Sequence, residues 1–129
     1  MIDYQKWRKT IQDVQARVNS DCSYATDELM HGVADFWDVM GLKQVGDCED
    51  YALEKRCRLR RLGIDWQDLR LATCWTETGA YHAVLVAVTD FGDLVLDNRY
   101  WSVTLWSACN YTWHLMQDAT GAWREVVKQ

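Results

Sequence analysis

The chain has 129 residues, a formal charge of −5 at pH 7 and an apolar fraction of 49%. This length and apolar content predict one compact domain, residues 1–129, rather than a disordered chain. The acidic balance argues against a nucleic-acid partner held by a basic surface, and no apolar run is long enough to span a bilayer.

Five cysteines are present, an odd number, and none forms a C-x-x-C pair. Neither a disulfide framework nor a structural zinc site is indicated, and a reducing compartment is expected. The first ten residues, MIDYQKWRKT, lack the apolar core of a secretion signal. We therefore expect a cytoplasmic protein, and a phage-encoded source is compatible with that location.

Three helices are predicted first, because apolar residues recur at three- and four-residue steps. They cover residues 4–18, 27–40 and 48–62. Asp3 can cap the first helix, and Gly63 is expected to end the third. The third helix presents one inward face, which comprises Tyr51, Ala52, Lys55, Leu59 and Leu62.

The pattern then changes to a period of two, which predicts strands. They cover residues 69–76, 81–89, 94–97, 111–116 and 122–127, separated by turn-forming residues at 77–79, 90–93 and 118–121. Because the helices come first and the strands follow in sequence, we expect an α+β domain with an antiparallel sheet.

The stretch GDCEDYA, residues 46–52, places Cys48 between the carboxylates of Asp47, Glu49 and Asp50. Neighbouring negative charges disfavour the thiolate, which is the reactive form of cysteine. The start of a helix favours a negative charge, but only by about 0.3–1 kcal/mol at an exposed end. Cys48 is therefore either an inert core residue or is activated by a histidine that forms a thiolate–imidazolium pair with it.

His82 is the best placed of the three histidines, since it opens the most apolar strand. Alternation puts it on the same face as Val84, Val86 and Val88. Asp97 closes the following strand, and antiparallel pairing brings the two strand ends together. Cys48, His82 and Asp97 could thus serve as nucleophile, base and orienting acid. A buried cysteine and a strand histidine are each more often structural.

The segment GDCEDYALEKRCRLRRLGI, followed by YHAVLV and VLDNR, resembles the bacterial transglutaminase-like cysteine peptidases. This family includes calcium-regulated periplasmic proteases that release biofilm adhesins, and the resemblance covers about residues 46–99. It implies a papain-like, transglutaminase-like fold, with N-terminal helices packed on the sheet. It also implies a cysteine hydrolase that cleaves an amide bond, with a peptide bond expected, through a thioester acyl-enzyme. Cys48 would be the nucleophile, His82 the general base and Asp97 the orienting acid.

The resemblance further suggests calcium bound by the acids around the nucleophile, which are Asp47, Glu49 and Asp50. Calcium prefers clustered carboxylate and carbonyl oxygens. Alternatively, Asp47 caps the third helix while the other two acids favour its positive first turn. No other cofactor is expected.

The expected partner is a protein or peptide substrate, with neither nucleic acid nor membrane, and a monomer is compatible with the sequence. Two other functions stay open. The same triad can pass the acyl group to an amine, as transglutaminases and amidases do. A non-catalytic module could instead hold a peptide or sugar on the tryptophans of the C-terminal third.

Overall fold

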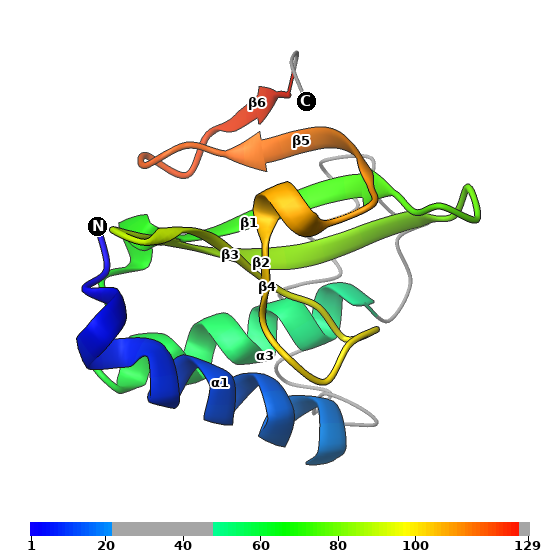
Figure 1. Ribbon diagram of the computed structural model, residues 1–129. Helices are drawn as coiled ribbons and strands as arrows, with labels where there is room; N and C mark the ends of the chain where they lie inside the picture. Colours follow the sequence, from blue (N-terminus) through cyan, green and yellow to red (C-terminus); the bar gives the residue numbers. More distant parts are fainter. Residues whose placement is uncertain (22–47, 127–129) are drawn as a thin grey trace.

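The computed structural model describes residues 1–21 and 48–126 (Figure 1). The helix predicted at 27–40 lies outside the described residues. The described helices are α1 (Tyr4–Asp21) and α3 (Cys48–Arg61). The strands are β1 (Leu69–Trp75), β2 (Tyr81–Thr89), β3 (Gly92–Leu96), β4 (Thr104–Leu105), β5 (Thr112–Gln117) and β6 (Trp123–Glu125). Short 3-10 turns cover Trp66–Asp68 and Trp106–Ala108.

The six strands form one sheet in the order β4-β3-β2-β1-β5-β6, and all neighbouring pairs are antiparallel. Figure 1 shows α1 and α3 on the same side of this sheet. The predicted α+β class with N-terminal helices on an antiparallel sheet is therefore confirmed. No helix in the described part of the chain is long and apolar enough to cross a membrane.

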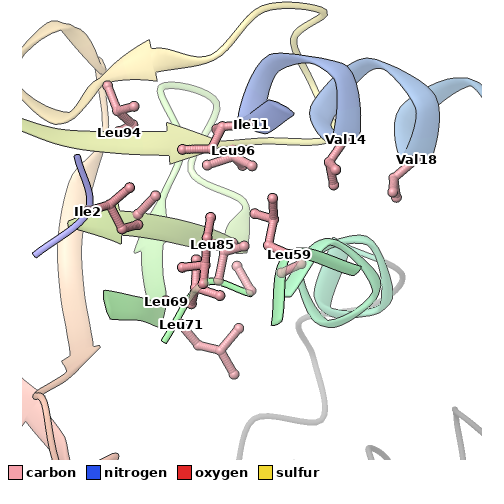
Figure 2. Close-up of a cluster of buried hydrophobic side chains, with 14 of the residues drawn as sticks. Ile2, Ile11, Val14, Val18, Leu59, Leu69, Leu71, Leu85, Leu94 and Leu96 are labelled. Carbon is pink, nitrogen blue, oxygen red and sulfur yellow. The ribbon is translucent and has the colours of Figure 1, made fainter. Parts of the chain in front are cut away.

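The core between the helices and the sheet is built from aliphatic side chains (Figure 2). Each side chain fully buried in such a layer stabilises the fold by about 1.5–3 kcal/mol relative to its exposed state. The α1 residues carry the predicted helical spacing, and the strand residues alternate along their strands. The layer includes Ile11, Val14 and Val18 from α1, Leu59 from α3, and Leu69, Leu71, Leu85, Leu94 and Leu96 from the sheet.

The end of α3 corrects one predicted core residue. Gly63 has a φ of +117°, and the backbone N–H groups of Gly63 and Ile64 donate to the carbonyls of Arg60 and Leu59. This is a Schellman motif, in which the residue after the glycine packs against the last helical turn. Ile64 is accordingly buried beside Leu59, whereas Leu62 is 54% exposed and does not join the core.

The opposite face of the sheet is also buried, because the segment after β4, from Trp106 to Tyr111, packs over it. Trp106 and Trp113 stack there with ring centroids 3.7 Å apart. They cover the outward side chains of β1, β2 and β3, which are Ala72, Cys74, Val84, Val86 and Val95. Burial on both faces explains why β2 is nearly continuously apolar rather than alternating.

The N-terminus is attached to the far end of β2. Ile2 forms a parallel bridge with Thr89, and its N–H donates to the carbonyl of Val88 at 2.8 Å. The Tyr4 ring stacks on Phe91 in the turn between β2 and β3, with centroids 4.5 Å apart. The first four residues, up to the start of α1, therefore hold the β2–β3 turn.

Candidate active site

Cys48 is the first residue of α3 and is 7% exposed. Its Sγ accepts a hydrogen bond from the backbone N–H of Ala83 at 3.3 Å. The last pair between β2 and β3 is Leu85 with Leu96, and continuing that register would place Ala83 opposite Asn98, beyond the end of β3. The sulfur thus takes the position on the edge of β2 that a longer β3 would occupy.

The surroundings of Cys48 keep its thiol protonated. Burial is the main effect that raises the pKa of the thiol to about 11. The charges of Glu49 and Asp97 act in the same direction, and the N–H groups of Ala83 and of Cys48 itself act in the opposite direction. A thiol with this pKa carries almost no thiolate at neutral pH. The sulfur therefore needs a base that removes its proton during any reaction.

His82 and Asp97 form a buried pair at the start of β2. Nε2 of the imidazole lies 2.7 Å from Oδ1 of the carboxylate, and the residues are 6% and 1% exposed. Continuing the register of β2 and β3 puts Asp97 opposite Val84, so His82 is its diagonal neighbour on the same face. An ionised carboxylate only accepts, so Nε2 carries the proton and Nδ1 is left to act as a base.

The Asp97 carboxyl group is held in its charged form. Burial alone would raise its pKa, but hydrogen bonds from His82, the Tyr111 hydroxyl and the Arg99 backbone N–H outweigh this effect and hold the pKa below its usual value. The negative charge therefore persists next to the imidazole at neutral pH and can stabilise an imidazolium.

The backbone after Asp97 is fixed by two amide side chains of α1. Gln15 Nε2 donates to the carbonyls of Asp97 and Tyr100, both at 2.8 Å. Asn19 Nδ2 donates to the same two carbonyls, at 3.0 and 2.7 Å. Sequence reasoning missed Gln15, Asn19 and Tyr111. The polar positions of α1 that face the core were the available signal for the first two.

The predicted calcium ligands are only partly within the described residues. Asp47 lies outside them, as does His31, one of the two histidines not chosen as the base. Glu49 is half-buried and Asp50 is buried, both in the first turn of α3. Among residues 1–21 and 48–126, no group of three His, Cys, Asp or Glu side chains is arranged to hold a metal ion.

The remaining histidine, His114, lies on β5 and is bound elsewhere. Its Nδ1 is 2.6 Å from the hydroxyl of Tyr81, and its ring packs beside Trp75. His114 is therefore a histidine that binds a phenol, whereas His82 binds a carboxylate.

Comparison with known proteins decides the family. A family model for the bacterial transglutaminase-like cysteine proteinases (BTLCP) matches residues 2–129. The chain belongs to this family. The expected enzyme class, a transglutaminase-like cysteine peptidase, is thereby confirmed. A comparison with curated proteins finds no match.

Solved structures of LapG from Legionella pneumophila share the fold of this BTLCP chain. One LapG structure is 21% identical to this chain with a TM-score of 0.62. The match covers 87% of this chain and 64% of the LapG chain. Calcium-bound LapG is 19% identical with a TM-score of 0.67, and the match covers 95% of this chain and 70% of the LapG chain. EGTA-treated LapG is 19% identical with a TM-score of 0.63, and the match covers 92% of this chain and 71% of the LapG chain. The BTLCP chain spans about two thirds of the LapG chains it matches, and the predicted transglutaminase-like fold is confirmed.

The expected cytoplasmic location is wrong. The match to the BTLCP family, which includes periplasmic proteases, and the similarity to LapG contradict it. The expectation rested on the apolar content of ten N-terminal residues and on the cysteine count, and both are weaker indicators of the compartment than the family match.

Proposed function

We propose that this BTLCP domain hydrolyses a peptide bond in a protein substrate, with Cys48 as nucleophile, His82 as general base and Asp97 as the orienting acid. The main support is the 2.7 Å contact between His82 Nε2 and Asp97 Oδ1, made one residue from the N–H group that holds the Cys48 sulfur. The family match and the order of these three residues along the chain agree with this assignment.

Acylation begins when Nδ1 of His82 removes the thiol proton and the Cys48 sulfur attacks the carbonyl carbon of the substrate. The imidazolium next gives that proton to the leaving amine as the C–N bond breaks, which leaves a thioester on Cys48. Asp97 stays ionised throughout and stabilises the imidazolium.

Hydrolysis of the thioester uses the same base. His82 removes a proton from water, the resulting hydroxide attacks the thioester carbon, and the proton returns to the sulfur as the acid product leaves. The backbone N–H of Cys48 is the proposed oxyanion donor, because it lies at the N-terminus of α3, where the helix dipole favours a negative charge.

The test is the rate at which iodoacetamide labels each cysteine, followed by mass spectrometry. Burial raises the pKa of Cys109 to about 11 as well, so this residue is a matched thiol without an assigned base. We expect Cys48 to be labelled at pH 7 at least about tenfold faster than Cys109. Burial keeps both thiols protonated, but only Cys48 has a paired base that can take its proton and form the reactive thiolate. His82→Ala should abolish the difference.

Two further observations sharpen this test. His114→Ala is the matched control and should leave the Cys48 rate unchanged, because His114 binds Tyr81 instead. With p-nitrophenyl acetate, the wild-type chain should release one equivalent of nitrophenolate in a burst and gain one acetyl group on Cys48. Equal labelling of Cys48 and Cys109 in the wild-type chain would refute the proposed function.

We also propose that calcium binds at the start of α3 through Glu49 and Asp50, with Asp47 as a further ligand. The donors suit the ion, since carboxylate oxygens are the ligands that calcium prefers. A cation there would offset the charge of Glu49, which disfavours the Cys48 thiolate. The calcium-bound LapG structure supports the same ion for this fold.

A further inference from the structure

The Asp97 carboxylate has a second side-chain partner that the proposed triad does not use. Oδ1 accepts hydrogen bonds from His82 Nε2 at 2.7 Å and from the Arg99 backbone N–H at 2.9 Å. Oδ2 accepts a hydrogen bond from the hydroxyl of Tyr111. Both oxygens are therefore occupied, and the carboxylate cannot rotate without losing contacts on each side.

Tyr111 also packs against the base itself. Its ring lies edge-on to the imidazole of His82, with centroids 5.7 Å apart and planes at 72°. Its other neighbour is Trp113, at 5.7 Å and 74°. Tyr111 is 9% exposed, so its ring is buried beside the His82–Asp97 pair.

The direction of the Tyr111 hydrogen bond is set by Arg99. Arg99 Nη1 donates to the Tyr111 hydroxyl oxygen at 3.1 Å, and the same guanidinium binds Glu77 at 2.9 and 2.7 Å. Because a guanidinium only donates, the phenol oxygen accepts from Arg99 and its proton points to Asp97. Burial, together with the neighbouring Asp97 charge, raises the pKa of Tyr111, so the phenol keeps this proton at neutral pH.

We propose that Tyr111 is a positioning residue for the reaction, whose hydroxyl orients the Asp97 carboxylate toward His82 and keeps it ionised. This inference rests on the proposed function of the triad. Arg99 and Glu77 hold the phenol in place from the loop after β3 and from the turn between β1 and β2.

The ionisation of Asp97 depends on groups from several elements. Besides His82, Tyr111 and Arg99, the titratable groups that act on or respond to its charge are Cys48 at the start of α3, Cys74 on β1, Cys109 before β5, and Glu77. All of these remain in a Tyr111→Phe variant, which removes only the hydroxyl. A change in the pH profile then reports the Tyr111–Asp97 hydrogen bond.

The experiment measures iodoacetamide labelling of Cys48 between pH 4 and 9 in the full chain carrying Tyr111→Phe. We expect the rate at pH 7 to fall about tenfold, because a hydrogen bond to a charged group orients the acid. The acid limb, which is the fall in labelling rate at low pH, should move to higher pH. Without the hydroxyl, Asp97 takes up a proton at higher pH and no longer stabilises the His82 imidazolium.

Tyr81→Phe is the matched control. It also removes a phenol that makes two hydrogen bonds, to Thr73 and His114, and it neighbours His82 in the chain, but it does not contact Asp97. Its labelling profile should match the wild type. Thermal melting of both variants measures any purely structural loss separately.

A Tyr111→Phe variant with a lower melting midpoint but a wild-type labelling rate and acid limb would overturn the inference while leaving the proposed function intact. If wild-type Cys48 is labelled no faster than Cys109, the proposed function itself fails. The two failures are thus distinguished by the wild-type measurement alone.

Discussion

Asp97 is the residue on which the charge balance of the site depends. Its carboxylate is almost completely buried, yet three donors keep its pKa below the usual value. A group whose pKa is lower in the folded than in the unfolded chain stabilises the fold above its unfolded pKa of about 3.9. That stabilisation is lost as the pH falls through the folded pKa.

Urea unfolding between pH 2 and 6 tests this linkage. We expect the free energy of unfolding of the wild-type chain to fall more steeply below about pH 4 than that of Asp97→Asn, which cannot take up this proton. The other acids are common to both chains, so the difference isolates Asp97. Parallel curves would show that the carboxyl group has a normal pKa.

At the level of elements, α1 contributes no proposed catalytic group but holds the loop that carries one. Gln15 and Asn19 bind the carbonyls of Asp97 and Tyr100, which lie more than 75 positions away in the sequence. Gln12, one turn before Gln15, binds the backbone of Trp101 and Val103 further along. One polar stripe on α1 therefore fixes the path of the chain from β3 to β4.

Gln15→Met tests this role of α1, because it removes both hydrogen bonds and keeps the length of the side chain. We expect the free energy of unfolding to fall by about 1–3 kcal/mol, as measured in urea, and Cys48 labelling to slow as Asp97 loses its fixed position. Gln12→Met should lower stability without slowing the labelling. A Gln15→Met chain that labels at the wild-type rate would contradict the role.

Sequence patterns predicted the long elements because these carry periodicity along the chain. The spacing from Tyr4 to Val18 identified α1, and the apolar run 81–89 matches β2 at both ends. β4 was missed, since two residues carry no detectable period. The first residue of β3 was also misplaced, because Gly92 belongs to the strand rather than to the turn.

The order of Cys48, His82 and Asp97 was available from the sequence because a motif surrounds each of them. The sequence did not predict the contacts that Tyr111, Gln15 and Asn19 make with Asp97, because these depend on how distant segments cross in space. For Gln15 and Asn19, polar positions on the inward face of α1 were the only signal. Tyr111 comes from a segment whose tryptophan-rich sequence carries no motif, and its side chain reaches the site only because that segment covers the second face of the sheet.

At the scale of the whole molecule, calcium should stabilise the fold if it binds the folded chain and not the unfolded one. A ligand at 100 times its dissociation constant contributes about 2.7 kcal/mol, which raises the melting midpoint of a domain of this size by about 8 °C. We expect such a rise in 1 mM calcium relative to EGTA.

The acids beside Cys48 provide the control for this measurement. The double variant Glu49→Gln, Asp50→Asn should lose the calcium response, and Glu125→Gln, an exposed acid on β6, should keep it. Magnesium should not substitute, because it demands a tighter octahedral set of ligands. Equal midpoints in calcium and EGTA would exclude a structural calcium site.

The attachment of Ile2 beside Thr89 determines where a tether can be placed. Seven residues of extended strand separate Thr89 from His82, a span of about 23 Å. A fusion partner, dye or surface linker joined ahead of Met1 would therefore start at the end of β2 that lies far from the Cys48 thiol. Immobilised or tagged versions of the chain should keep the approach to Cys48 open from that direction.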